Sequence, residues 1–93
     1  MIVGSCEIEL LIYESNSLKE KRHVLKSIIE RIKSRFNVSV AEVEYNDLWN
    51  RALIGIAVVS NEKALCESVI LKIIDFIEND ERVEIIRHTM EVI

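Results

Sequence analysis

Apolar and polar side chains alternate along residues 2–13, at the start of the chain. Ile8, Leu10 and Ile12 fall on one side of an extended backbone, whereas Glu7 and Glu9 fall on the other. A period of two with a single polar face is typical of a β-strand that packs on one side only. The pattern therefore predicts a first strand over residues 2–13.

Two later segments place their apolar residues three or four positions apart, which indicates amphipathic helices. The first begins at Ser17, which forms a capping box with Glu20, and we expect it to end near Arg35 with Asn37 as a left-handed stop. The second follows residues 60–62, which offer capping side chains, and runs to about Glu78.

Three further segments, 38–45, 48–60 and 83–93, are rich in valine and isoleucine and predict strands. The resulting order is β-α-β-β-α-β. Right-handed crossovers place both helices on one face of a four-stranded antiparallel sheet, with the first and third strands in its centre. We therefore predict a single α+β domain over residues 1–93, a ferredoxin-like βαββαβ sandwich whose other sheet face is open.

Composition narrows the choice of chemistry. The chain has no proline and two cysteines, Cys6 and Cys66, which stand far apart among apolar residues. No ligand spacing for zinc and no glycine-rich nucleotide loop occurs, so we expect no metal and no cofactor. The longest uncharged apolar run, 52–59, is far shorter than the roughly 20 residues that a membrane helix needs. We expect a cytoplasmic protein without a membrane segment.

Positive charge is concentrated in the first helix. Residues 17–36 hold seven basic and two acidic side chains, a net charge of +5, although the whole chain carries −4. At about 100° per residue, four of the basic residues occupy roughly a sixth of the helix circumference. One more basic residue lies nearer the buried side. The candidate nucleic-acid-binding residues are Lys19, Arg22, Lys26 and Lys33, together with Lys21 close to the buried side.

Such a stripe can neutralise RNA phosphates, with affinity that depends on salt and little on sequence. The alternative is that these side chains simply solvate the outer face of an amphipathic helix.

The open sheet face is the second candidate surface. Its predicted interaction residues are Glu7, Glu9, Trp49, Arg51 and Leu53. Trp49 and Leu53, with Leu11, would form an apolar patch, and Arg51 would pair with Glu7 or Glu9 across neighbouring strands. This face favours an alternative function, a homodimeric protein-interaction or regulatory domain that binds no nucleic acid.

Four segments resemble the YlxP-like family of small bacterial proteins: SLKEKR at 17–22, FNVSVAEV at 36–43, DLWNRA at 47–52 and VVSN at 58–61. The resemblance implies a ferredoxin-like fold. Members are often encoded near transcription and ribosome-maturation factors, which implies association with RNA or a ribosomal particle. Acylphosphatases share this size and topology, but the connector 14–16 lacks their arginine and glycine. The leading prediction is a non-enzymatic, homodimeric module that binds RNA or a ribosomal particle.

Overall fold

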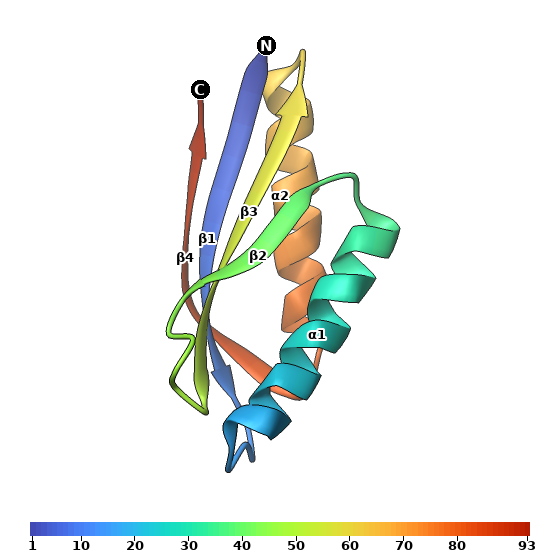
Figure 1. The fold of residues 1–93 in the computed structure, drawn as a ribbon. Helices are drawn as coiled ribbons and strands as arrows, with labels where there is room; N and C mark the ends of the chain where they lie inside the picture. Colours follow the sequence, from blue (N-terminus) through green and yellow to red (C-terminus); the bar gives the residue numbers. More distant parts are fainter.

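The architecture is a four-stranded antiparallel sheet with two helices on one face (Figure 1). A computed structural model describes all residues 1–93. Its elements are β1 (Ile2–Ile12), α1 (Leu18–Arg35), β2 (Ser39–Glu44), β3 (Arg51–Ser60), α2 (Lys63–Glu78) and β4 (Val83–Val92). The strand order is β2-β3-β1-β4, which confirms the predicted ferredoxin-like fold and the central position of the first and third strands.

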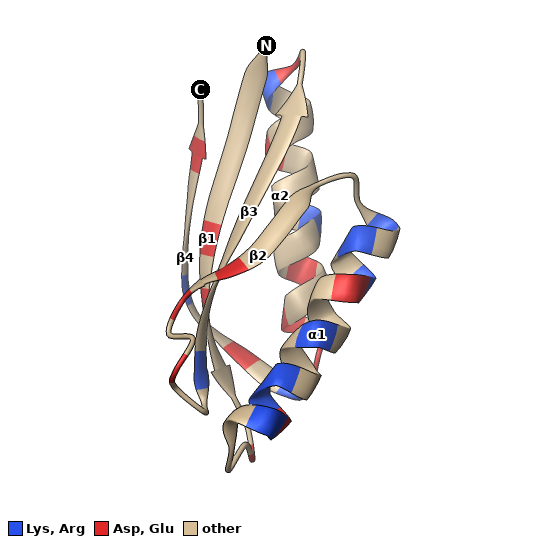
Figure 2. Ribbon diagram, in the orientation of Figure 1, with Lys and Arg blue, Asp and Glu red and all other residues tan.

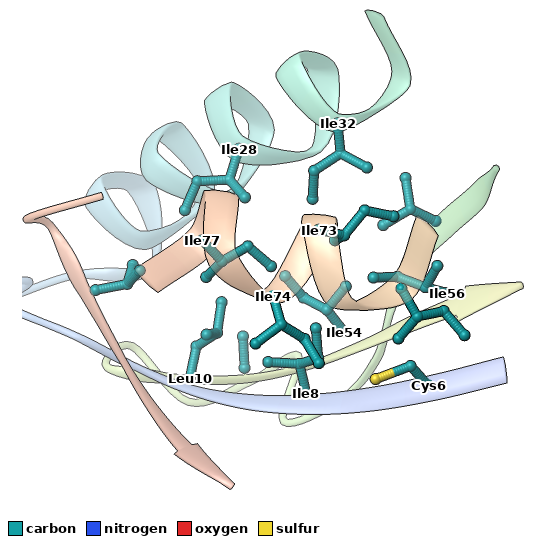
Figure 3. Close-up of a cluster of buried hydrophobic side chains, with 14 of the residues drawn as sticks. Cys6, Ile8, Leu10, Ile28, Ile32, Ile54, Ile56, Ile73, Ile74 and Ile77 are labelled. Atoms are coloured by element: carbon teal, nitrogen blue, oxygen red, sulfur yellow. The ribbon is translucent and has the colours of Figure 1, made fainter. Parts of the chain in front are cut away.

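The core lies between the helices and one face of the sheet. Alternate residues of β1 and β3 point into it, and α1 and α2 add isoleucines from above (Figure 3). Ile8, Ile54, Ile28 and Ile73 are all completely buried. Burial of one such side chain contributes roughly 1.5–3 kcal/mol to stability. The apolar residues that recur every two positions in the strands and every three or four positions in the helices thus form one shared core.

The close contact between β1 and α2 depends on a glycine. A Cβ atom at Gly4 would lie 3.0 Å from Cβ of Cys66 and 3.1 Å from Cδ1 of Ile70. Both distances are shorter than ordinary van der Waals contact between carbon atoms. Gly4 therefore lets α2 pack directly against the first strand.

The start of α1 is capped as predicted. Ser17 Oγ accepts a hydrogen bond from the Glu20 amide at 3.1 Å. The Glu20 carboxylate in turn accepts from the Asn16 amide at 2.7 Å, one residue earlier than the capping-box pattern predicts. The backbone amides of Asn16 and Glu20, at the start of α1, thereby each have a hydrogen-bond acceptor.

The end of α1 differs from the prediction. Phe36 is the C-cap and has an extended backbone, while its N–H donates to Ile32 O. Asn37 is not left-handed, because the positive φ values lie at Glu14 (56°) and Tyr45 (67°). The predicted left-handed stop is therefore wrong; the chain leaves the helix in an extended form that leads directly into β2.

The connection between β2 and β3 is longer than expected, because β3 begins at Arg51 rather than at residue 48. Residues 45–50 form a loop instead. Neither helix is both long enough and apolar enough to cross a membrane.

The cap at Ser17 yields a stability prediction. We expect Ser17→Ala to lower the free energy of unfolding by about 1 kcal/mol, because it leaves a helix N–H without its acceptor. Urea unfolding followed by circular dichroism measures this change. Ser34→Ala is the matched control: its hydroxyl donates only to Arg31 O within the last turns of α1, so the change should be close to neutral. Equal losses in the two variants would contradict the role of the cap.

Candidate functional site

The rotation of α1 about its own axis decides which of its charged residues reach solvent. Leu25, Ile28 and Ile32 are buried against the sheet. The apolar packing therefore directs one flank of the helix outward over the edge strand β2, and Figure 2 shows how much basic charge α1 carries. Four predicted residues lie exposed on this flank, which we call the basic flank: Lys19, Arg22, Lys26 and Lys33.

The cations of the basic flank have no carboxylate partners, since none of the four takes part in an ion pair. Three of them, Arg22, Lys26 and Lys33, line a shallow groove between α1 and β2. Glu30 and Glu42 also line this groove. The carboxylate of Glu42 is already paired with the buried Lys21, at 2.8 Å from Nζ. The structure thus brings four of the five predicted residues together as unpaired, exposed cations.

Lys21 is a correction to the predicted set. Its side chain is fully buried, with no exposed surface. Its ammonium donates to the Tyr45 carbonyl at 2.6 Å and lies 2.8 Å from Glu42 Oε2, in an ion pair without the alignment of a hydrogen bond. An ammonium enclosed in this way cannot reach a phosphate. Lys21 is a structural residue that ties α1 to β2 and to the loop that follows.

The predicted interaction residues on the open sheet face are also partly enclosed. Glu9 is only 6% exposed, because two arginines hold it from the neighbouring strands. Arg51 Nη1 donates to Glu9 Oε2 at 3.0 Å, and Arg87 Nε donates to Oε1 at 2.9 Å. The pairing of Arg51 with Glu9 is therefore confirmed. The triad braces β3, β1 and β4 on the side without helices.

The predicted apolar patch on this face does not form as expected. Leu53 is 8% exposed, so it offers almost no surface to a partner, although it lies opposite Glu9 on the helix-free face. Trp49 is 47% exposed but belongs to the loop before β3. Glu7 is exposed, in register with Gly55 and Thr89. With Leu53 buried and Trp49 outside the strand, the predicted apolar patch of Trp49, Leu53 and Leu11 does not form on the sheet.

A cleft of about 910 Å³ between the two helices was not predicted. Its lining includes Arg31, Arg35 and Lys72, none of which is in an ion pair, and Arg35 lies 4.8 Å from the centre of the Phe76 ring. Asp80 lines it as well, and its bidentate bonds to the Arg82 guanidinium lower the pKa of that carboxyl. The four-residue spacing of Arg31 and Arg35 was visible in the sequence, but the approach of Lys72 from α2 was not.

No three His, Cys, Asp or Glu side chains are grouped in a way that could hold a metal ion. Both cysteines are buried, and burial together with the nearby Glu7 carboxylate raises the pKa of the Cys6 thiol to about 11. Cys6 and Cys66 pack as small apolar side chains.

Comparison with known proteins shows the family. Residues 3–90 match the family described as "Protein of unknown function (DUF503)". The chain belongs to this family. It is 41% identical over 83 residues to the Bacillus subtilis (strain 168) protein named "Uncharacterized protein YlxP", covering 89% of this chain and 90% of that protein. The YlxP-like resemblance read from the sequence is thereby confirmed.

Solved structures support the fold. A de novo designed protein with a ferredoxin fold superposes with a TM-score of 0.65 at 14% identity, over 98% of this chain and 86% of the design. At this level of identity the likeness concerns the fold alone.

Two of the segments that carry the family resemblance, 17–22 and 47–52, meet at one end of the molecule. Lys21 in the first segment binds the Tyr45 carbonyl just before the second. Ser15 Oγ donates to the Trp49 carbonyl at 2.6 Å and adds a second tie. These side-chain bonds hold the loop 45–50 against the start of α1. The family motif thus includes a structural joint beside the basic flank.

Removing the buried ammonium tests this joint. We expect Lys21→Met to lower the free energy of unfolding by roughly 2–4 kcal/mol, because Glu42 loses its partner while remaining mostly enclosed. Urea unfolding measures the loss. The double variant Lys21→Met/Glu42→Gln should regain part of it, since no unpaired charge is left. A single variant as stable as the wild type would show that the ion pair does not hold the joint.

Proposed function

We propose that this protein is a non-enzymatic binding module that contacts the phosphate backbone of RNA, alone or within a ribosomal particle, through the basic flank of α1. The observation that carries the proposal is the set of four exposed, unpaired cations on one flank of a single helix. Because no carboxylate neutralises these four side chains, their charge is available to a polyanion.

The geometry of the helix suits a rod-shaped polyanion. At 1.5 Å per residue, Lys19 and Lys33 lie about 21 Å apart along the axis of α1. The flank is therefore a straight, narrow row rather than a pocket. Such a row fits successive backbone phosphates and makes no contact with base edges, so we expect binding with little sequence preference.

The remainder of the molecule limits where RNA can bind. The chain as a whole carries −4, so a polyanion approaching most other surfaces meets repulsion. Positive charge near the start of a helix also opposes the helix dipole, and Lys19 and Arg22 carry this small cost to stability. A phosphate-binding role would account for cations in these positions.

Replacing the four cations by glutamine tests the proposal. We expect Lys19→Gln/Arg22→Gln/Lys26→Gln/Lys33→Gln to weaken binding to a fluorescent RNA duplex by roughly a hundredfold at about 0.1 M salt. The slope of log K against log salt should become shallower by about 3, since each phosphate contact contributes about 0.7–0.9. Fluorescence anisotropy over a range of salt concentrations measures both effects.

A matched control removes four positive charges elsewhere. The variant Arg31→Gln/Arg35→Gln/Lys63→Gln/Lys72→Gln carries the same net charge but keeps the basic flank, so its affinity should fall much less. Equal losses in the two variants would show that only net charge matters. Wild-type protein that fails to bind RNA, or binding that survives the loss of the basic flank, would overturn the proposal.

A further inference from the structure

The two edges of the sheet are protected to very different degrees. At one edge, β2 is six residues long, contains a bulge between Glu42 and Glu44, and lies under α1. At the other edge, β4 is ten residues long, is irregular only at Ile86, and has no strand paired with its outer side (Figure 1). β4 contains neither proline nor lysine, two residues that commonly block an edge strand. Its outer backbone groups are therefore open to another strand.

The hydrogen bonds inside the sheet show which residues of β4 point outward. Val3 and Ile93 exchange both backbone bonds, Val3 N to Ile93 O at 2.8 Å and Ile93 N to Val3 O at 2.9 Å. The direction of the backbone N–H and C=O groups alternates from one residue to the next along an antiparallel strand. These groups therefore face β1 in Ile93 and in the odd-numbered residues before it, back to Arg87. The N–H and C=O groups of His88, Met90 and Val92 consequently face solvent.

This alternation limits how β4 can pair with a second copy of itself. For two residues directly opposite each other in an antiparallel pair, the backbone N–H and C=O groups either all point toward the other strand or all point away from it. A two-fold axis must therefore place one residue opposite the same residue of the second copy. An axis between two consecutive residues would pair outward-facing backbone groups with inward-facing ones. The possible centres in the exposed, regularly paired stretch are Arg87, His88, Thr89, Met90 and Glu91.

Charge selects one of these centres. An axis at Arg87 places two arginines face to face, and an axis at Glu91 places two glutamates face to face. Axes at His88 and Met90 leave both Arg87 and Glu91 opposite uncharged residues. Only an axis at Thr89 places Arg87 opposite Glu91 of the second copy, and it does so twice. Arg87 is free to make this contact, because its side chain is 70% exposed and binds Glu9 through Nε alone.

We propose that two copies of this chain associate through their β4 strands about a two-fold axis at Thr89, which joins the two sheets into one. His88 of each copy exchanges both backbone hydrogen bonds with Met90 of the other. Exposed apolar side chains lie toward both ends of the paired stretch, since Ile86 is 40% and Ile93 is 75% exposed. The contact leaves the basic flank open, because α1 lies over the opposite edge of the sheet (Figure 1). It does not depend on the RNA proposal.

A contact between two edge strands is small. Interfaces below about 1,200 Å² usually belong to weak complexes, so we expect a dissociation constant in roughly the micromolar to millimolar range. Sedimentation equilibrium from about 1 µM to about 1 mM should show the mass rise from monomer to dimer. A mass that stays monomeric over this range would overturn the proposal.

Two substitutions separate the edge contact from other forms of self-association. Met90→Pro removes an outward N–H and no hydrogen bond within the sheet, so the monomer should fold and the dimer should be lost. Met90→Leu is its control and should dimerise like the wild type. Glu91→Arg should also raise the dissociation constant, by about tenfold or more, because it places two like charges opposite each other. Dimers that survive Met90→Pro would show that another surface is used.

A cysteine at the axis tests the register directly. In the proposed pairing, the two Thr89 residues face each other as a non-hydrogen-bonded pair with Cα atoms about 4.5 Å apart, which is within the range that a disulfide bridges. Thr89→Cys should therefore form a covalent dimer on mild oxidation, visible on a non-reducing gel. Both native cysteines are buried and should contribute little background.

Glu91→Cys is the control for register. The two introduced cysteines would be offset by four residues, roughly 13 Å, and should not cross-link. Cross-linking of Glu91→Cys as efficient as that of Thr89→Cys would overturn the assigned axis. A β4 edge that captures a strand of a different protein while this chain stays monomeric would equally contradict a second copy as the occupant.

Discussion

The rotation of α1 on the sheet is the constraint on which the arrangement of the candidate surface depends. Leu25, Ile28 and Ile32 are almost completely buried, and burial of each contributes roughly 1.5–3 kcal/mol. Turning the helix by one residue, about 100°, would expose this apolar row. No single surface charge is worth as much, so the core decides that Lys21 points inward and the basic flank points outward. The distribution of charge is thus a consequence of packing.

A fully buried lysine is costly unless its ammonium is paired and hydrogen-bonded. Lys21 meets both conditions through Glu42 and the carbonyl of Tyr45, a residue held at a positive φ. The bond therefore fixes the position of a loop that has little regular structure of its own. It also explains why two sequence segments typical of the family, separated by some 25 positions, meet at the same end of the molecule. One of these segments carries the start of the basic flank.

The helix-free face shows how an open sheet can be partly closed by its own side chains. Glu9 lies beneath Arg51 and Arg87, so a carboxylate is sheltered on a face that no helix covers. This brace engages one end of each guanidinium and leaves the rest of Arg87 exposed. The two proposed surfaces then lie at opposite ends of the strand order, with RNA over β2 and a second copy against β4. Neither surface obstructs the other.

Local patterns in the sequence were sufficient for the element order, the helix cap at Ser17 and the four exposed cations, because each depends on neighbours within a few residues. The same patterns also indicated the family. Tertiary structure alone decided that Lys21 and Leu53 are buried, that Asn37 is not a left-handed stop, and that Lys72 approaches Arg31 and Arg35. Each of these outcomes depends on how distant elements pack together. Periodicity shows which side of a helix or strand is apolar. It does not show which distant residues pack against the positions beside that apolar side.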